Sequence, residues 1–131
     1  MPNKLAIIIP AYNEGSVLNA TALAVRRVLK KLPVVSAIII VNDGSLDNTK
    51  VVAEQVGDII LTHRQNAGLG ASLGTGIEYA KRHGFSYLIT YDADGQHDPQ
   101  DILKAYTALK AGSDVVIGSR FLGVHEQMPR L

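Results

Sequence analysis

Short aliphatic runs alternate along the chain with longer segments in which apolar residues recur every three or four positions. Runs without polar alternation predict strands covered on both faces, and the longer pattern predicts amphipathic helices. We expect strands near residues 5–9, 37–41, 58–62, 85–91 and 114–117. We expect helices near residues 16–31, 47–56 and 69–82, and a further helix that Asp98 caps and Pro99 opens. The alternation predicts an open, mainly parallel α/β sheet with helices on both faces.

The composition is that of an ordinary globular domain, with 131 residues, 47% hydrophobic residues and a formal net charge of +1. We therefore expect a single domain over residues 1–131. Cysteine is absent, which excludes disulfides, thiolate zinc sites and a cysteine nucleophile. The balanced charge, without a basic cluster, argues against a nucleic-acid partner.

No aliphatic run approaches the roughly 20 residues that a membrane helix needs, so we expect no transmembrane segment in this chain. The apolar run that ends at Pro10 is too short for a signal peptide. We expect a cytoplasmic protein, placed at the cytoplasmic face of a membrane if the full-length protein is longer.

Unusual polar residues follow the predicted strands, where an open α/β sheet binds its ligands. They form four groups, at residues 10–14, 42–45, 66–68 and 92–97. Because the carboxyl ends of parallel strands meet at one edge, we expect these groups to line one crevice.

Asp92 and Asp94 follow a buried strand and are two residues apart, so in an extended segment both carboxylates point to the same side. Such a pair suits Mg²⁺ or Mn²⁺, with a substrate diphosphate completing the coordination. An Asp-rich turn is the alternative. The position of the pair after a buried strand, beside residues 95–97, favours the metal site. His97 is assigned either a metal or sugar contact or a solvated place in the turn.

Asp43, Tyr12 and Glu14 suit a nucleoside when taken together. The Asp43 carboxylate can accept hydrogen bonds from a nucleobase, Tyr12 can stack on it, and Glu14 can accept from ribose hydroxyls. Singly, each residue also fits a structural role, Asp43 as part of a turn. With the acidic pair opposite, they predict a nucleotide-sugar pocket.

Residues 68–76 are rich in glycine but do not form a dinucleotide-binding fingerprint. We expect Gly68 and Gly70 to allow a tight start of the helix, whose N–H groups are available to phosphate. We expect Gly74 and Gly76 to let that helix pack closely on the sheet. Arg120 is either a phosphate ligand or a surface residue. The remaining histidines, at positions 63, 83 and 125, are assigned no role.

Four motifs in order, at residues 7–14, 41–45, 66–68 and 92–97, resemble the family 2 glycosyltransferases of the GT-A fold. Residues 92–97 together with 118–120 look most like the dolichyl-phosphate mannose synthase or polyprenyl-phosphate glycosyltransferase branch.

The resemblance implies a role for each matching residue. The metal ligands would be Asp92, Asp94 and Gln96, and the two aspartates would act in catalysis through the metal. The nucleotide-sugar would be bound by Pro10, Ala11, Tyr12, Glu14, Val41, Asp43, Asn66, Gly68, Ala93 and Arg120. No general base is identified.

The resemblance implies inverting, metal-dependent transfer of a hexose from a GDP- or UDP-sugar to a polyprenyl or dolichyl phosphate. A saccharide acceptor and a non-catalytic nucleotide-sugar-binding module are the alternatives. A phosphoacceptor receiver domain has a similar length, but it would need an acidic pair after the first strand and a lysine after the fifth, which are absent here. Family members continue well beyond residue 131, so we expect a C-terminally truncated chain that binds the donor but transfers sugar poorly or not at all.

Overall fold

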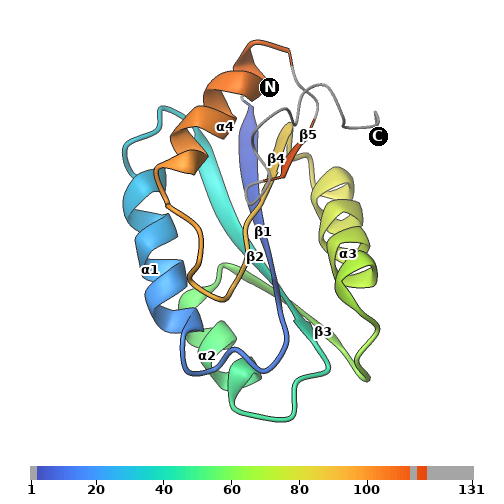
Figure 1. The fold of residues 1–131 in the computed structure, drawn as a ribbon. Coiled ribbons are helices and arrows are strands. Elements are labelled where there is room, and N and C mark those ends of the chain that lie inside the picture. The colour runs from blue at the N-terminus through green and yellow to red at the C-terminus, as the bar shows by residue number, and fades with distance from the viewer. Residues whose placement is uncertain (1–2, 113–114, 118–131) are drawn as a thin grey trace.

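The computed structural model of the chain describes residues 3–112 and 115–117. Five parallel strands form one sheet in the order β3-β2-β1-β4-β5, and each of the first four is followed by a helix (Figure 1). The elements are β1 (Lys4–Ala11), α1 (Leu18–Leu29), β2 (Val35–Asp43), α2 (Thr49–Val56), β3 (Ile59–His63), α3 (Leu69–Arg82), β4 (Tyr87–Thr90), α4 (Asp101–Lys110) and β5 (Val115–Ile117). The expected open parallel α/β sheet is confirmed.

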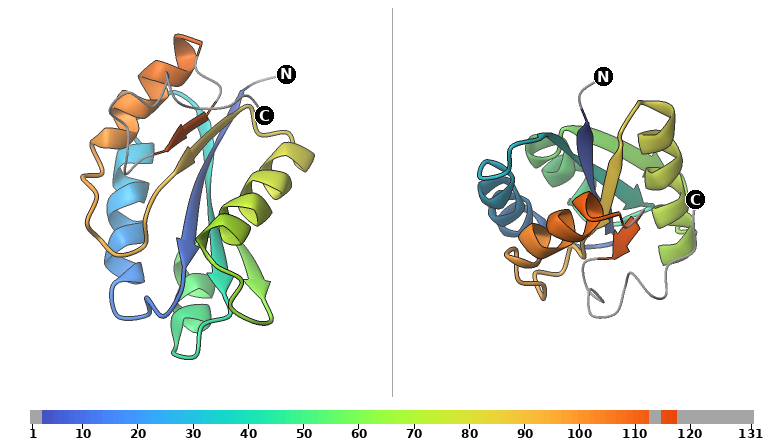
Figure 2. Two further views of the ribbon diagram at one scale, coloured as in Figure 1. Left: turned by 45° about the vertical axis from the view of Figure 1, so that its right-hand side comes forward. Right: turned by 90° about the horizontal axis from the view of Figure 1, so that it is seen from above.

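The aliphatic runs of β1 and β2 form the centre of the molecule. The two strands pair in register, with Ile7 opposite Ile38 and Ile9 opposite Ile40. These side chains are fully buried because helices cover both faces of the sheet. Helices α1, α2 and α4 lie on one face, and α3 lies on the other (Figures 1 and 2).

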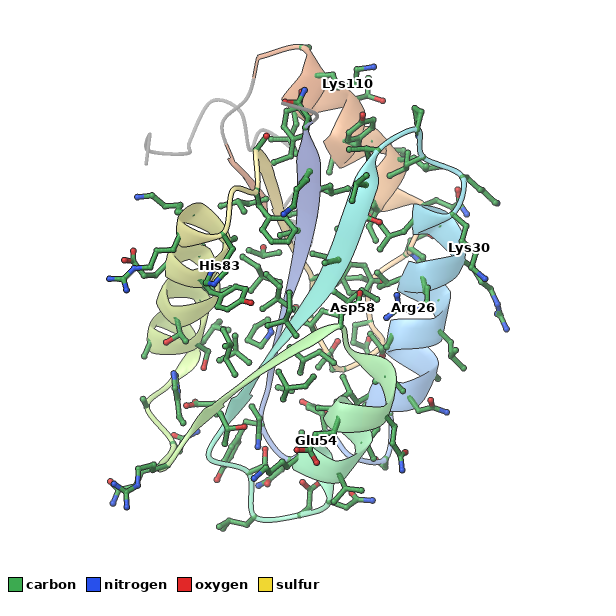
Figure 3. All side chains as sticks on the ribbon, turned by 180° about the vertical axis from the view of Figure 1, so that it is seen from behind. Arg26, Lys30, Glu54, Asp58, His83 and Lys110 are labelled. Atoms are coloured by element: carbon green, nitrogen blue, oxygen red, sulfur yellow. The ribbon has the colours of Figure 1, made fainter. Side chains whose placement is uncertain are left out.

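An ion pair joins α1 to the chain just before β3. Arg26 Nη1 lies 3.2 Å from Asp58 Oδ2, and Arg26 Nη2 donates to the carbonyl of Val56 at 2.8 Å. Figure 3 shows the two side chains pointing toward each other. The same Asp58 oxygen accepts the Ile38 N–H at 2.8 Å, so one carboxylate ties α1 to β2.

Three predicted helices begin later than expected, among them α2, which begins at Thr49 rather than residue 47. The first begins at Leu18 rather than residue 16, because the Val17 and Leu18 N–H groups both donate to the Glu14 carbonyl in a turn. The last begins at Asp101 rather than Pro99. Asp98 still accepts the Gln100 N–H at 2.9 Å, as a residue that starts a helical turn does.

The third and fourth strands also differ from expectation at their ends. β3 extends to His63, one residue beyond the predicted strand, and β4 is shorter, from Tyr87 to Thr90. Phe85 lies before β4 because its N–H donates to the Ala80 carbonyl at the end of α3.

Close packing of α3 on the sheet depends on Gly76. A Cβ at this position would lie 2.5 Å from Ile8 Cγ2 and 3.3 Å from Val41 Cγ2, so only glycine fits without movement. The prediction is confirmed for Gly76 and wrong for Gly74, which has no neighbour within 4 Å of such a Cβ. Because side chains alternate along a strand, Pro10 and Asp43 lie on the same face as Ile8 and Val41. The carboxyl ends of β1 and β2 therefore present these two residues beneath the start of α3.

None of the helices in the described part of the chain is both long and apolar enough to cross a bilayer.

Candidate nucleotide-sugar site

A cavity of about 320 Å³ lies at the carboxyl ends of β1, β2 and β4, beside the N-terminus of α3. Its lining residues are Pro10, Ala11, Tyr12, Glu14, Asp43, Asn66, Gly68, Leu69, Ser72, Asp92, Ala93 and Asp94. The four polar groups that the sequence places after strands thus meet in one cavity, as expected from the sheet topology.

Two of the predicted site residues that the structure describes do not line this cavity, Val41 and Gln96. The Val41 side chain is fully buried beneath α3, where it faces Gly76. Gln96 is exposed in the turn after β4. Arg120 lies outside the described residues.

Two lining residues were not predicted, Leu69 and Ser72. Both lie on the first turn of α3, three positions apart and thus on one face of the helix. Ser72 is only 1% exposed, and its Oγ has no hydrogen-bond partner among the described residues. Helical spacing from Gly76 could have indicated both residues. Gly76 packs against the sheet, and Leu69 and Ser72 lie on the same face of α3, so this face also borders the cavity.

The loop after β1 is held by hydrogen bonds to the loop after β2. The Glu14 N–H donates to Thr49 Oγ1 at 2.9 Å, and the Gly15 N–H donates to Asp47 Oδ2 at 3.2 Å. The Asp47 carboxylate also accepts the Thr49 hydroxyl and N–H, and the Thr49 hydroxyl bond is the main cause of its lowered pKa. Asp47, which precedes the N-cap residue Asn48, therefore holds the first residue of α2 and the loop around Glu14 at the same time.

The Asp43 side chain is 5% exposed and accepts four hydrogen bonds from its own chain. Oδ1 accepts from His63 Nδ1 at 2.7 Å and from the Ala67 N–H at 2.8 Å. Oδ2 accepts from Asn66 Nδ2 at 2.9 Å and from the Gly68 N–H at 2.8 Å. Burial alone would raise the pKa of Asp43, but these bonds outweigh it and the pKa is lowered. The carboxylate is thus ionised at neutral pH and fixes the loop that leads into α3.

Gly44 makes this arrangement possible. Its φ of +68° is a conformation that side chains disfavour, and a Cβ there would lie 2.4 Å from the Asn66 backbone nitrogen. The turn after β2 can therefore pack directly against the backbone of the loop after β3.

At the other end of the cavity, His97 holds Asp92. The side chain of His97 is 8% exposed, so the interpretation of a solvated turn histidine is wrong. The Asp92 N–H donates to His97 Nδ1 at 3.3 Å, which places the imidazole proton on Nε2, 2.9 Å from Asp92 Oδ2. The ring packs edge-on against Tyr91 at 4.8 Å between centroids. This contact fixes the orientation of the Asp92 carboxylate.

Carboxylates gather around this end without cationic partners among the described residues. Asp92 is 43% exposed, Asp94 is exposed, and Asp94 Oδ1 accepts only the Gln96 N–H, at 2.9 Å. Burial raises the pKa of Glu14, and the charges of Asp94, Asp47 and Asp92 raise it further. Neighbouring negative charges of this kind favour a bound cation.

This set of oxygen donors fits Mg²⁺ or Mn²⁺ when the substrate supplies further ligands. In the described part of the chain, no group of three or more His, Asp or Glu side chains is arranged to hold a metal by itself. A pair of carboxylates completed by diphosphate oxygens and water is a usual magnesium site, and Asp92 and Asp94 provide that pair. Tyr91 lies behind them, and burial, followed by the charge of Asp98, raises its pKa to about 12, so it is a neutral hydrogen-bond donor to the His97 carbonyl.

Curated relatives share this sequence over most of its length. A polyprenol monophosphomannose synthase of Mycolicibacterium smegmatis is 38% identical over 122 residues, which cover 88% of this chain and 44% of the relative. A dolichol-phosphate mannosyltransferase of Pyrococcus furiosus is 32% identical over 123 residues, covering 91% of this chain and 34% of the relative. The chain thus spans less than half the length of either relative.

Solved glycosyltransferase structures share the fold. The glucosyl-3-phosphoglycerate synthase of Mycobacterium tuberculosis, in complex with Mn²⁺, UDP and glucosyl-3-phosphoglycerate, superposes with a TM-score of 0.65 over 82% of this chain and 39% of that protein, at 17% identity. This likeness confirms the expected GT-A type of fold. The sequence profile of the family described as glycosyl transferase family 2 matches residues 6–127. The chain belongs to glycosyl transferase family 2.

Proposed function

We propose that this chain forms the donor-binding part of a hexosyltransferase that uses a nucleoside-diphosphate sugar and a divalent cation. The observation that carries the proposal is the single cavity that joins Tyr12 and Asp43 to Asp92 and Asp94. One end offers an aromatic ring and a buried polar wall, and the other offers free carboxylate oxygens. A nucleoside followed by a diphosphate has this order of chemical groups.

In this proposal, Tyr12 stacks on the nucleobase and Glu14 accepts hydrogen bonds from the ribose. The tyrosine is 43% exposed at the rim, so a base can reach its face. Asp92 and Asp94 hold Mg²⁺ or Mn²⁺ with the diphosphate, and the exposed Gln96 is the third candidate ligand. The bound cation would stabilise the negative charge of the leaving diphosphate. The Mn²⁺ and UDP in the similarly folded synthase support this assignment.

We further propose a polyprenyl phosphate as the acceptor, since the curated relatives are named for polyprenol- and dolichol-phosphate mannosyl transfer. In such a transfer, the bond from the anomeric carbon to the diphosphate breaks, and a bond to an acceptor phosphate oxygen forms on the opposite face. A phosphate is already an anion at neutral pH, so this acceptor needs no general base.

Calorimetric titration of the 131-residue chain tests the donor site. GDP, UDP, GDP-mannose and UDP-glucose are titrated with and without Mn²⁺, beside an Asp92→Ala/Asp94→Ala variant. We expect binding of one nucleotide that requires Mn²⁺ and is lost in the variant. Absence of binding by the unaltered chain, or equal binding by the variant, would contradict the proposed site.

A transfer assay with a polyprenyl phosphate acceptor tests the catalytic part of the proposal. We expect little or no turnover from the 131-residue chain, because it spans less than half of its relatives. Sustained turnover would overturn this expectation. If a full-length homologous protein also binds the donor but shows no turnover, the chain is a nucleotide-sugar-binding module instead of part of an enzyme.

A further inference from the structure

His63 lies next to Asp43 because β2 and β3 pair in parallel register, with Asp43 opposite His63 at the last position of both strands. The imidazole is 19% exposed, and each ring nitrogen has a partner. Nδ1 lies 2.7 Å from Asp43 Oδ1, and Nε2 lies 2.8 Å from Thr75 Oγ1 on α3. The histidine thus bridges the sheet edge and the second turn of α3.

The direction of the hydrogen bond between His63 and Asp43 follows from the partner. The Asp43 carboxylate only accepts, so Nδ1 of His63 carries the proton. A hydrogen bond from an imidazole to a carboxylate fixes both the tautomer and the ring orientation. His63 therefore supplies the one side-chain donor at Asp43 Oδ1, where the other donor is the Ala67 N–H.

Asp43 in turn holds the loop that leads into α3. A carboxylate offers about four lone-pair directions, and Asp43 receives two donors on each oxygen. Three of these donors belong to residues 66–68, of which Asn66 and Gly68 line the cavity. The carboxylate therefore acts on the cavity by fixing its wall.

We propose that His63 is a positioning residue for donor binding: by holding Asp43, it sets the backbone of residues 66–68 that forms the wall of the cavity at its nucleoside end. The inference rests on the proposed donor site and adds to it a residue outside the cavity lining.

Two substitutions separate the contacts of the two ring nitrogens. The side-chain amide nitrogen of asparagine reaches about as far as Nδ1, and that of glutamine about as far as Nε2. We expect His63→Asn to keep the nucleotide dissociation constant within about twofold, and His63→Gln to weaken binding about tenfold, the effect of one lost hydrogen bond to a charged group. His83→Asn and His83→Gln are matched controls, since His83 is exposed and its imidazole bonds and stacks on Tyr79, away from the cavity lining. Calorimetry with UDP or GDP and Mn²⁺ gives the constants.

Two readouts need no nucleotide. Nitrogen-15 NMR should show the His63 proton on Nδ1, and the Ala67 and Gly68 amides should be protected from hydrogen exchange. In His63→Gln, this protection should fall while overall folding is retained.

The outcomes distinguish this inference from the proposed function. If the unaltered chain binds no nucleotide, the proposed donor site fails, whatever the NMR result. If it binds nucleotide and His63→Gln binds equally well, or if neutral His63 carries its proton on Nε2, the positioning role is overturned.

Discussion

The carboxylates at the two ends of the cavity differ in burial and in the number of hydrogen bonds that they accept from the protein. At the nucleoside end, Asp43 is buried and receives four hydrogen bonds from its own chain, and its pKa is lowered. At the other end, Asp92 and Asp94 each receive one side-chain or turn donor among the described residues, and the pKa of nearby Glu14 is raised. A carboxylate satisfied by the protein shapes the site, whereas carboxylates with free oxygens beside other negative charges suit the cation that we propose.

The largest effect is expected from Asp43→Asn. The asparagine amide turns an NH₂ group toward N–H donors whose hydrogen bonds the Asp43 carboxylate accepts. We therefore expect a loss of about 3 kcal/mol in the free energy of unfolding at pH 7. Urea denaturation measures it. Glu54→Gln is the control, because Glu54 is exposed on α2, and we expect a change within about 0.5 kcal/mol.

The same variant sharpens the comparison through pH. Since the pKa of Asp43 is lowered from 3.8, its stabilisation is fully present above that value and is lost as pH falls through the lowered pKa. The difference in unfolding free energy between the unaltered chain and Asp43→Asn should therefore shrink in acid. A difference that stays constant down to pH 2 would contradict an ionised Asp43 as its source.

A smaller effect is expected from His97→Ala, at the end of the cavity that Asp92 and Asp94 line. This substitution removes the hydrogen bond that orients Asp92, and loss of such a supporting bond weakens metal binding about tenfold or more. Titration of Mn²⁺ in the presence of the nucleotide that the chain binds measures the effect. His83→Ala should bind Mn²⁺ as the unaltered chain does, and equal affinity of the His97 variant would show that Asp92 needs no such support.

The smallest effect is a change in the pKa of Glu14. Burial is the largest cause of the raised pKa, and its contribution should remain when a cation binds. The parts due to Asp94 and Asp92 should be offset by the positive charge, so the pKa should fall toward 4.5 when Mg²⁺ and nucleotide are added. Carbon-13 NMR of the Glu14 carboxyl follows it. An unchanged pKa would place the cation away from this cluster.

Much of the fold and the place of the site could be predicted from the sequence. The uninterrupted aliphatic runs of β1 and β2 indicate buried parallel strands, and parallel strands bring their carboxyl ends to one edge. Tyr12, Asp43, Asp92 and Asp94 therefore meet as expected.

The roles of the two histidines could not be predicted, for separate reasons. His63 is 20 positions from Asp43, and only the register of β2 against β3 makes them neighbours. A strand prediction that ends one residue early leaves His63 in a loop. His97 turns back onto Asp92 through a turn in which Gly95 has a φ of +78°, and residue spacing alone does not specify that geometry.

The most direct test of the central claim is the free energy of unfolding of Asp92→Asn/Asp94→Asn, without cation and then with Mn²⁺ and the bound nucleotide. We predict that the variant without cation is at least as stable as the unaltered chain, because it carries less repulsion near Glu14. The unaltered chain should gain stability with Mn²⁺ and nucleotide, and the variant should gain none. A variant that is markedly less stable without cation, or that gains as much as the unaltered chain, would contradict the assignment of this end to a cation.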